Sequence, residues 1–75
     1  MARTSAEKTH DHTAAGDSVT LINTLVAQSS LTDDEKETIQ RNVDHLELMV
    51  AKSDWESGQS TTAFSTAITA GKAKL

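Results

Sequence analysis

The 75-residue chain has no cysteine, no proline and no tyrosine, and its only aromatic residues are one tryptophan and one phenylalanine. The absence of cysteine excludes disulfides, thiolate metal sites and a cysteine nucleophile. Large apolar residues are also few, and a chain of this length buries only about 60% of its unfolded surface when it folds. Contact with a second copy or with another protein is therefore the remaining way to enlarge a thin core.

Basic residues are in the minority, because seven Lys and Arg stand against eleven Asp and Glu, for a formal net charge of −4. A nucleic-acid-binding protein needs a basic surface that displaces counterions, so this balance argues against nucleic acid as a partner. It argues equally against electrostatic anchoring to a membrane. No apolar run approaches the roughly 18 residues that span a bilayer, and the first residues lack the apolar segment of a secretory signal. We expect a protein that is made in the cytoplasm of its producing cell.

Motifs for catalysis are missing as well, since no G-x-S-x-G, Walker or G-x-G-x-x-G pattern occurs. The acidic cluster at residues 33–37 lies at a helix start, where the helix dipole favours negative charge. His10 and His12 flank Asp11 and suggest a metal, but a stable zinc site needs about four ligands and His45 is the only other histidine. We expect no enzyme, no metal and no cofactor, with His10 and His12 in a solvated tail.

The N-terminal residues 1–16, MARTSAEKTHDHTAAG, contain no large apolar residue after Met1. Such a composition is typical of flexible segments, because nothing in it can be buried to offset the entropy of ordering. We expect an extended N-terminal arm here, flexible alone or ordered by a partner. A small helical domain is predicted over residues 17–75.

The strongest helix signal covers residues 31–54. Thr32 and Glu35 form a T-x-x-E capping box, in which each side chain bonds the backbone N–H of the other residue. Apolar residues then step by four, three and four, the spacing of a seam that packs along another helix. The predicted seam consists of Ile39, Val43, Leu46 and Val50.

Weaker helix signals flank this segment. Residues 17–30 place their apolar side chains on one broad arc behind Asp17 or Ser18 as N-cap. A break at a glycine precedes a third helix, which Ser60 or Thr61 can cap. We therefore predict an all-α fold of two to three short helices, arranged as a helical hairpin or a small bundle.

Small residues recur every fourth position in the third helix, at Ala63, Ala67 and Gly71. Such a strip lets another backbone approach closely. Gly71 has a second interpretation as the residue that ends the helix, and the enrichment of glycine at that position favours this interpretation.

The face opposite the seam raises the question of partners. Leu48 lies at about 180° from Ile39 on a helical wheel, and Trp55 at about 160° if the helix continues that far. Either the third helix folds back over Leu48 and Trp55, or both stay exposed and bind a partner, as tryptophan does at interface hot spots. The general preference for core burial favours the first explanation for Trp55. The candidate partner-binding residues are Leu48, Trp55, Arg41 and Lys52.

Residues 30–75 resemble, in style, the small helical proteins that tailed bacterial viruses encode. The resemblance rests on the capped LTDDEKETIQ start, the N-V-x-H-L-E-x-M helix and the closing A-I-x-A-G-K segment. It implies a virion or assembly role and brings no catalytic motif.

We therefore expect a non-enzymatic structural protein, a small phage virion component such as a capsid decoration, cement or adaptor protein. Contacts with protein partners in a larger assembly, or with copies of itself, would hold it in the virion. The alternative is a small soluble, cytoplasmic regulator that dimerises through its helices and binds one host protein.

Overall fold

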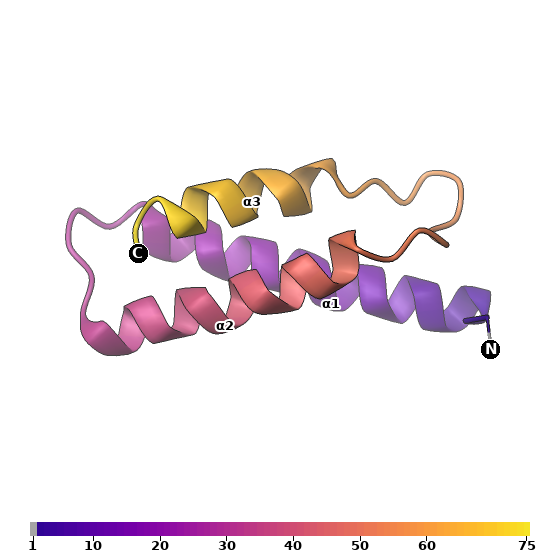
Figure 1. The fold of residues 1–75 in the computed structure, drawn as a ribbon, viewed down its shortest axis with the longest axis horizontal. Coiled ribbons are helices and arrows are strands. Elements are labelled where there is room, and N and C mark those ends of the chain that lie inside the picture. Colours follow the sequence, from indigo (N-terminus) through magenta and orange to yellow (C-terminus); the bar gives the residue numbers. More distant parts are fainter. Residues whose placement is uncertain (1) are drawn as a thin grey trace.

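The computed structural model describes residues 2–75, which form three helices and contain no strand; Met1, the first residue of the predicted arm, lies outside this range. The helices are α1 (Ser5–Val26), α2 (Asp33–Val50) and α3 (Thr62–Lys72). Each helix packs against the other two. In Figure 1, α2 runs antiparallel to α1, and α3 runs antiparallel to α2. The all-α prediction is confirmed.

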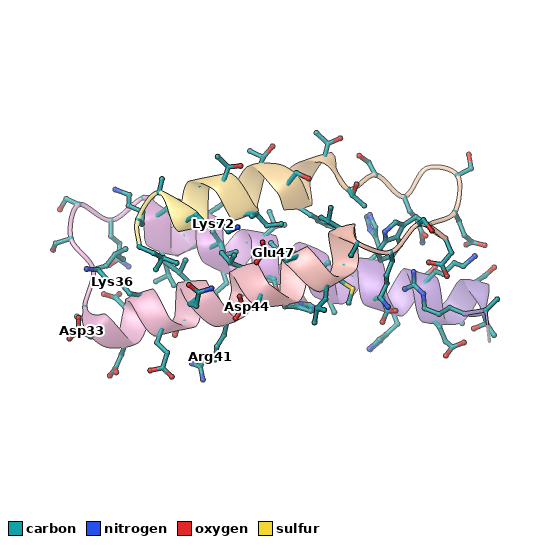
Figure 2. All side chains as sticks on the ribbon, in the orientation of Figure 1. Asp33, Lys36, Arg41, Asp44, Glu47 and Lys72 are labelled. Carbon is teal, nitrogen blue, oxygen red and sulfur yellow. The ribbon has the colours of Figure 1, made fainter. Side chains whose placement is uncertain are left out.

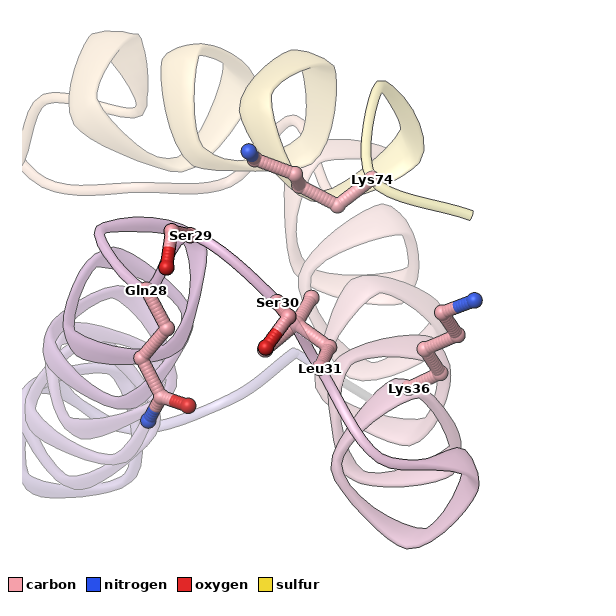
Figure 3. A pocket seen from close by; sticks show the side chains of 6 residues that line it. All are labelled: Gln28, Ser29, Ser30, Leu31, Lys36 and Lys74. Atoms are coloured by element: carbon pink, nitrogen blue, oxygen red, sulfur yellow. The ribbon is translucent and has the colours of Figure 1, made fainter.

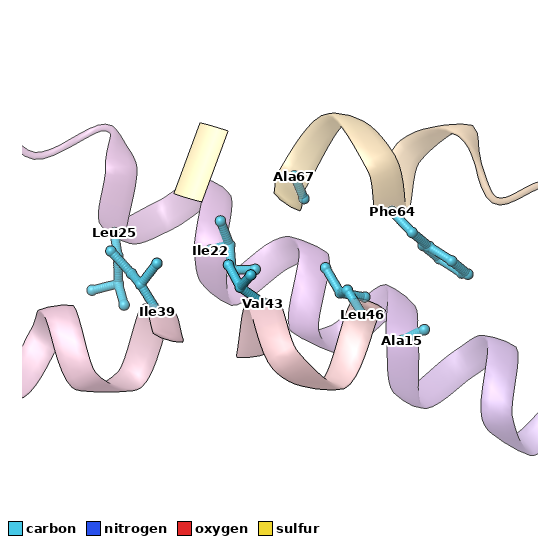
Figure 4. Packing of buried hydrophobic residues seen from close by; sticks show 8 residues of the cluster. All are labelled: Ala15, Ile22, Leu25, Ile39, Val43, Leu46, Phe64 and Ala67. Carbon is cyan, nitrogen blue, oxygen red and sulfur yellow. The ribbon is translucent and has the colours of Figure 1, made fainter. Parts of the chain in front are cut away.

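The apolar core lies where the three helices meet (Figure 4). Its fully buried large side chains are Ile22 of α1 and Ile39, Val43 and Leu46 of α2. Phe64 of α3 closes the core at 2% exposure. The predicted seam of α2 is therefore confirmed at its first three positions, whereas the fourth is only half-buried, in the last turn of the helix.

Capping boxes start both long helices. The Thr32 hydroxyl accepts a hydrogen bond from the Glu35 amide at 3.1 Å, and the Glu35 carboxylate accepts one from the Thr32 amide at 2.9 Å. Thr4 and Glu7 make the same pair of contacts at α1, at 3.1 and 2.8 Å. The hydrogen bond from the threonine amide lowers the pKa of each glutamate below its ordinary value. Both boxes satisfy amides that a helix start leaves without partners.

Residues 5–16 are helical rather than extended, so the predicted extended N-terminal arm is not confirmed. They form the first half of α1, which continues through Asp17 and Ser18, the residues predicted as its N-cap. Figure 1 shows this half of α1 extending past the end of α2, where the connection between α2 and α3 covers it. This half-helix thus packs on the loop, and it also contacts α3 where His12 meets Phe64.

Gly71 lies inside α3 and is buried. Among the described residues only Gly58 has a positive φ, of 89°, so the interpretation of Gly71 as the helix-ending residue is wrong. A Cβ at Gly71 would lie 2.8 Å from Val43 Cγ2 and 3.1 Å from Ile39 Cγ2. The missing side chain, together with the small and buried Ala67, lets α3 approach α2 closely.

Gly71→Ala should destabilise the domain, because the new methyl group would collide with the stiff, branched Val43 and overpacking costs about 1–3 kcal/mol. Val43→Ala removes the opposing methyl groups. The double variant should therefore be less destabilised than the sum of the two single variants, by about 1 kcal/mol. Urea unfolding of the three variants and the wild-type chain measures this coupling.

Gly16 provides the matched control for this experiment, because it also lies inside a helix but a Cβ there would meet nothing within 4 Å. Gly16→Ala should raise the free energy of unfolding by about 0.5–1 kcal/mol through helix propensity alone. Strictly additive effects of Gly71→Ala and Val43→Ala would contradict the close approach of α3 to α2.

Candidate protein-binding surface

The exposed face of α2 carries one large apolar side chain. Leu48 follows the fully buried Leu46 by two residues, yet it is 66% exposed. Arg41 and Asp44 precede it on the same face, about two turns and one turn away, and both are exposed (Figure 2). Gln40 donates a hydrogen bond to the Asp44 carboxylate at 2.8 Å. We call Arg41, Asp44 and Leu48 the outward face of α2.

The four predicted partner-binding residues do not share one face. Leu48 and Arg41 lie on the outward face of α2, whereas Lys52 and Trp55 lie beyond the end of the helix at Val50. Lys52 is half-buried, and its amide donates to the Met49 carbonyl at 3.2 Å in the turn that ends α2. The helical wheel assumed that α2 continues to Trp55, so it does not place Lys52 or Trp55 on this face.

Trp55 packs within the molecule, which is the first of the two explanations open for it. Its indole Nε1 donates to the Met49 carbonyl at 3.2 Å. Its ring meets those of His12 and Phe64 in edge contacts, with centroid distances of 5.5 and 6.3 Å. α3 thus helps to cover Trp55 but leaves Leu48 exposed, so the two residues have separate surroundings.

Arg3 stacks on the Trp55 ring, with its guanidinium carbon 4.6 Å from the ring centroid. Arg3 Nε and Nη2 each donate to one carboxylate oxygen of Asp54, and Nη1 donates to Asp11 at 2.5 Å. The hydrogen bonds to Asp54 raise the pKa of Arg3 above its ordinary value, and they hold the pKa of Asp54 below its own. Sequence reasoning missed this arrangement, because Arg3 and Asp54 lie 51 residues apart.

The segment between α2 and α3, residues 51–61, is tied to the first half of α1 by further hydrogen bonds. They join Ser5 Oγ to Glu56 at 2.5 Å, Gln59 Nε2 to Thr9 Oγ1 at 3.4 Å, and His12 Nε2 to the Ser60 carbonyl at 2.8 Å. Because a carbonyl only accepts, His12 Nε2 is the donor. His12 also lies 5.0 Å from Phe64 between ring centroids and is half-buried, so its predicted place in a solvated tail is wrong.

His45 joins α2 to α1. Its Nδ1 lies 2.7 Å from Ser18 Oγ, and Ser18 is only 6% exposed. A buried hydroxyl group requires a hydrogen-bond partner, and His45 supplies it. This contact explains the burial of Ser18 inside α1.

Two open hollows of similar size lie on the surface that the described residues form. One of about 310 Å³ is lined by Gln28, Ser29, Ser30, Leu31, Lys36 and Lys74. Figure 3 shows the ammonium groups of Lys36 and Lys74 pointing in different directions. The other, of about 320 Å³, is lined by Ala6, Glu7, His10 and Asp11 of α1. Within residues 2–75, no three His, Asp or Glu side chains gather as a metal site requires.

None of the helices formed by residues 2–75 combines the length and the apolar character needed to cross a membrane. The chain matches no protein-family model, no curated protein and no solved structure. Its function is therefore inferred from its own residues and their arrangement.

Proposed function

We propose that the chain is a non-enzymatic structural protein that binds a protein partner through the outward face of α2. The observation that supports this proposal is the 66% exposure of Leu48, beside a fully buried Leu46 on the same helix. A lone exposed leucine is ordinary on a protein surface. Here Arg41 and Asp44 flank it, which matches an interface with an apolar centre and a polar rim in which arginine is enriched.

The setting that we propose is a phage virion, in which the chain serves as a capsid decoration, cement or adaptor protein after synthesis in the host cytoplasm. The resemblance of residues 30–75 to small helical proteins of tailed bacterial viruses supports this setting. The elongated shape, 41 × 19 × 16 Å, supports it further, because α2 lies along the long side of the molecule and offers its outward face to a neighbouring subunit (Figure 1).

A soluble regulator that dimerises through this same face is the second candidate, and one observation favours it. Arg41 and Asp44 carry opposite charges about one turn apart, so the face is complementary to itself across a two-fold axis. Size-exclusion chromatography with light scattering separates the candidates. A stable dimer would favour the regulator, whereas an 8.0 kDa monomer would favour the assembly component.

Leu48→Lys should leave the free energy of unfolding within about 0.5 kcal/mol of the wild-type value, as for ordinary surface substitutions. It should weaken association at least about tenfold, because an unpaired charge in a desolvated contact is costly. Chemical denaturation measures the first effect. Co-sedimentation of the variant with virus particles from its host measures the second.

Ser65→Lys is the matched control, because Ser65 is exposed on α3 and receives the same charge away from the outward face. It should incorporate like the wild-type chain. Normal incorporation of Leu48→Lys would contradict the proposed surface, and unfolding of that variant would place Leu48 in the core instead.

A further inference from the structure

We propose that Trp55, Asp54 and Asp11 form a binding site for a guanidinium group, which the chain's own Arg3 fills and which accepts an arginine of a partner protein when Arg3 leaves. This inference stands apart from the outward face of α2, because none of the three residues belongs to that face. It concerns the far end of the molecule, where the connection between α2 and α3 covers the start of α1 (Figure 1).

The geometry of the site selects guanidinium over ammonium. Asp54 takes two parallel hydrogen bonds from Arg3 Nε and Nη2, and Asp11 takes a third from Nη1 at 2.5 Å. The ring of Trp55 lies against the guanidinium, at 4.6 Å from its central carbon, within the range of cation–π attraction. Only a planar fork of donors satisfies two carboxylates at its edges and an aromatic ring at its face together. A lysine ammonium is a point charge and cannot reproduce this set of contacts.

The walls of the site do not depend on Arg3 for their positions. Trp55 is held by its hydrogen bond to Met49 and by its contacts with His12 and Phe64. Asp11 belongs to α1. The segment that carries Asp54 remains tied to α1 by the hydrogen bonds of three later residues, Glu56, Gln59 and Ser60. Departure of Arg3 would therefore leave a preformed site.

Arg3 can leave without loss of a helix. It precedes Thr4, the N-cap of α1, and takes no part in the hydrogen bonds between Thr4 and Glu7. The site lies at the surface, because the side chains of Asp11 and Asp54 retain 29% and 42% exposure. A short link holds Arg3 near the site at an effective concentration of at least the order of millimolar. To displace Arg3, a partner's arginine must therefore compete with this effective concentration, and further contacts between the partner and the chain would have to strengthen its binding.

Ethylguanidinium tests the proposal in the Arg3→Ala chain. It should shift the indole N–H resonance of Trp55 in proton–nitrogen NMR spectra, along a curve that saturates at millimolar concentrations. Ethylammonium at the same concentrations should produce no saturable shift. In the wild-type chain the midpoint for ethylguanidinium should be at least tenfold higher, because Arg3 competes for the site. Circular dichroism verifies that Arg3→Ala is folded, and Arg3→Lys serves as the second variant if it is not.

Asp54→Asn in the Arg3→Ala background is the control for the contacts that bind the ligand. It should abolish the saturable shift, since one neutral amide replaces the bidentate carboxylate. Three results would overturn the proposal: equal shifts with the two cations, the same midpoint in the wild-type and Arg3→Ala chains, or undiminished binding after Asp54→Asn.

Discussion

Removal of residues 2–16 should destabilise the domain by at least about 3 kcal/mol, as the sum of a lost helix cap, aromatic contacts and hydrogen bonds. A 75-residue domain has a total stability of roughly 4–11 kcal/mol, so the deletion would remove about a quarter of that stability or more. Helical circular dichroism should fall by more than the twelve deleted residues of α1 account for, because α3 and the connection before it lose their contacts with His12 and Arg3. Thermal and urea unfolding of both chains measure the change.

Two substitutions in the same segment supply the control. His10→Ala and Thr13→Ala change exposed side chains of α1 and should each alter stability by less than about 0.5 kcal/mol. A shortened chain with the thermal midpoint of the full chain, and with undiminished helix content over residues 17–75, would contradict the structural role of this half-helix. It would favour the extended arm instead.

The sequence predicted α2 well because its information is local. The capping box of Thr32 and Glu35 involves residues three apart, and the buried Ile39, Val43 and Leu46 recur at the helical period. Both signals are properties of a single helix and need no knowledge of the tertiary structure.

The first half of α1 could not be found by the same reasoning, because apolar content was the criterion. That half is held by hydrogen bonds to residues 48 to 51 positions away, such as His12 with Ser60 and Ser5 with Glu56, and by the aromatic contacts of His12. One local signal was nevertheless present. Thr4 and Glu7 repeat the T-x-x-E spacing of the second helix, and this spacing marks the start of α1.

The candidate site was predictable only in part. The helical period correctly placed Leu48 opposite the seam, where it is exposed. The helical period failed for Trp55, because α2 ends at Val50 although no glycine or proline occurs between Val50 and Gly58. The end of this helix is tied to tertiary contacts, namely the hydrogen bond from Trp55 to Met49 and the aromatic packing around the indole ring.

Leu46→Ala should lower the free energy of unfolding by about 2–5 kcal/mol, whereas Leu48→Ala should change it by less than about 0.5 kcal/mol. The two leucines belong to the same helix and the substitution is identical, so helix propensity contributes equally to both variants. They differ in burial, because Leu46 is fully buried and Leu48 is 66% exposed.

Each kcal/mol by which the two variants differ in stability corresponds to roughly 4–8 °C in thermal midpoint, which circular dichroism resolves readily. Partner binding should show the opposite pattern at a temperature where both variants remain folded: Leu48→Ala should weaken association, and Leu46→Ala should leave it unchanged. Equal destabilisation by the two substitutions would mean that Leu48 is buried. Because the seam and the outward face lie on opposite sides of one helix, this pair of variants separates folding from binding in a single experiment.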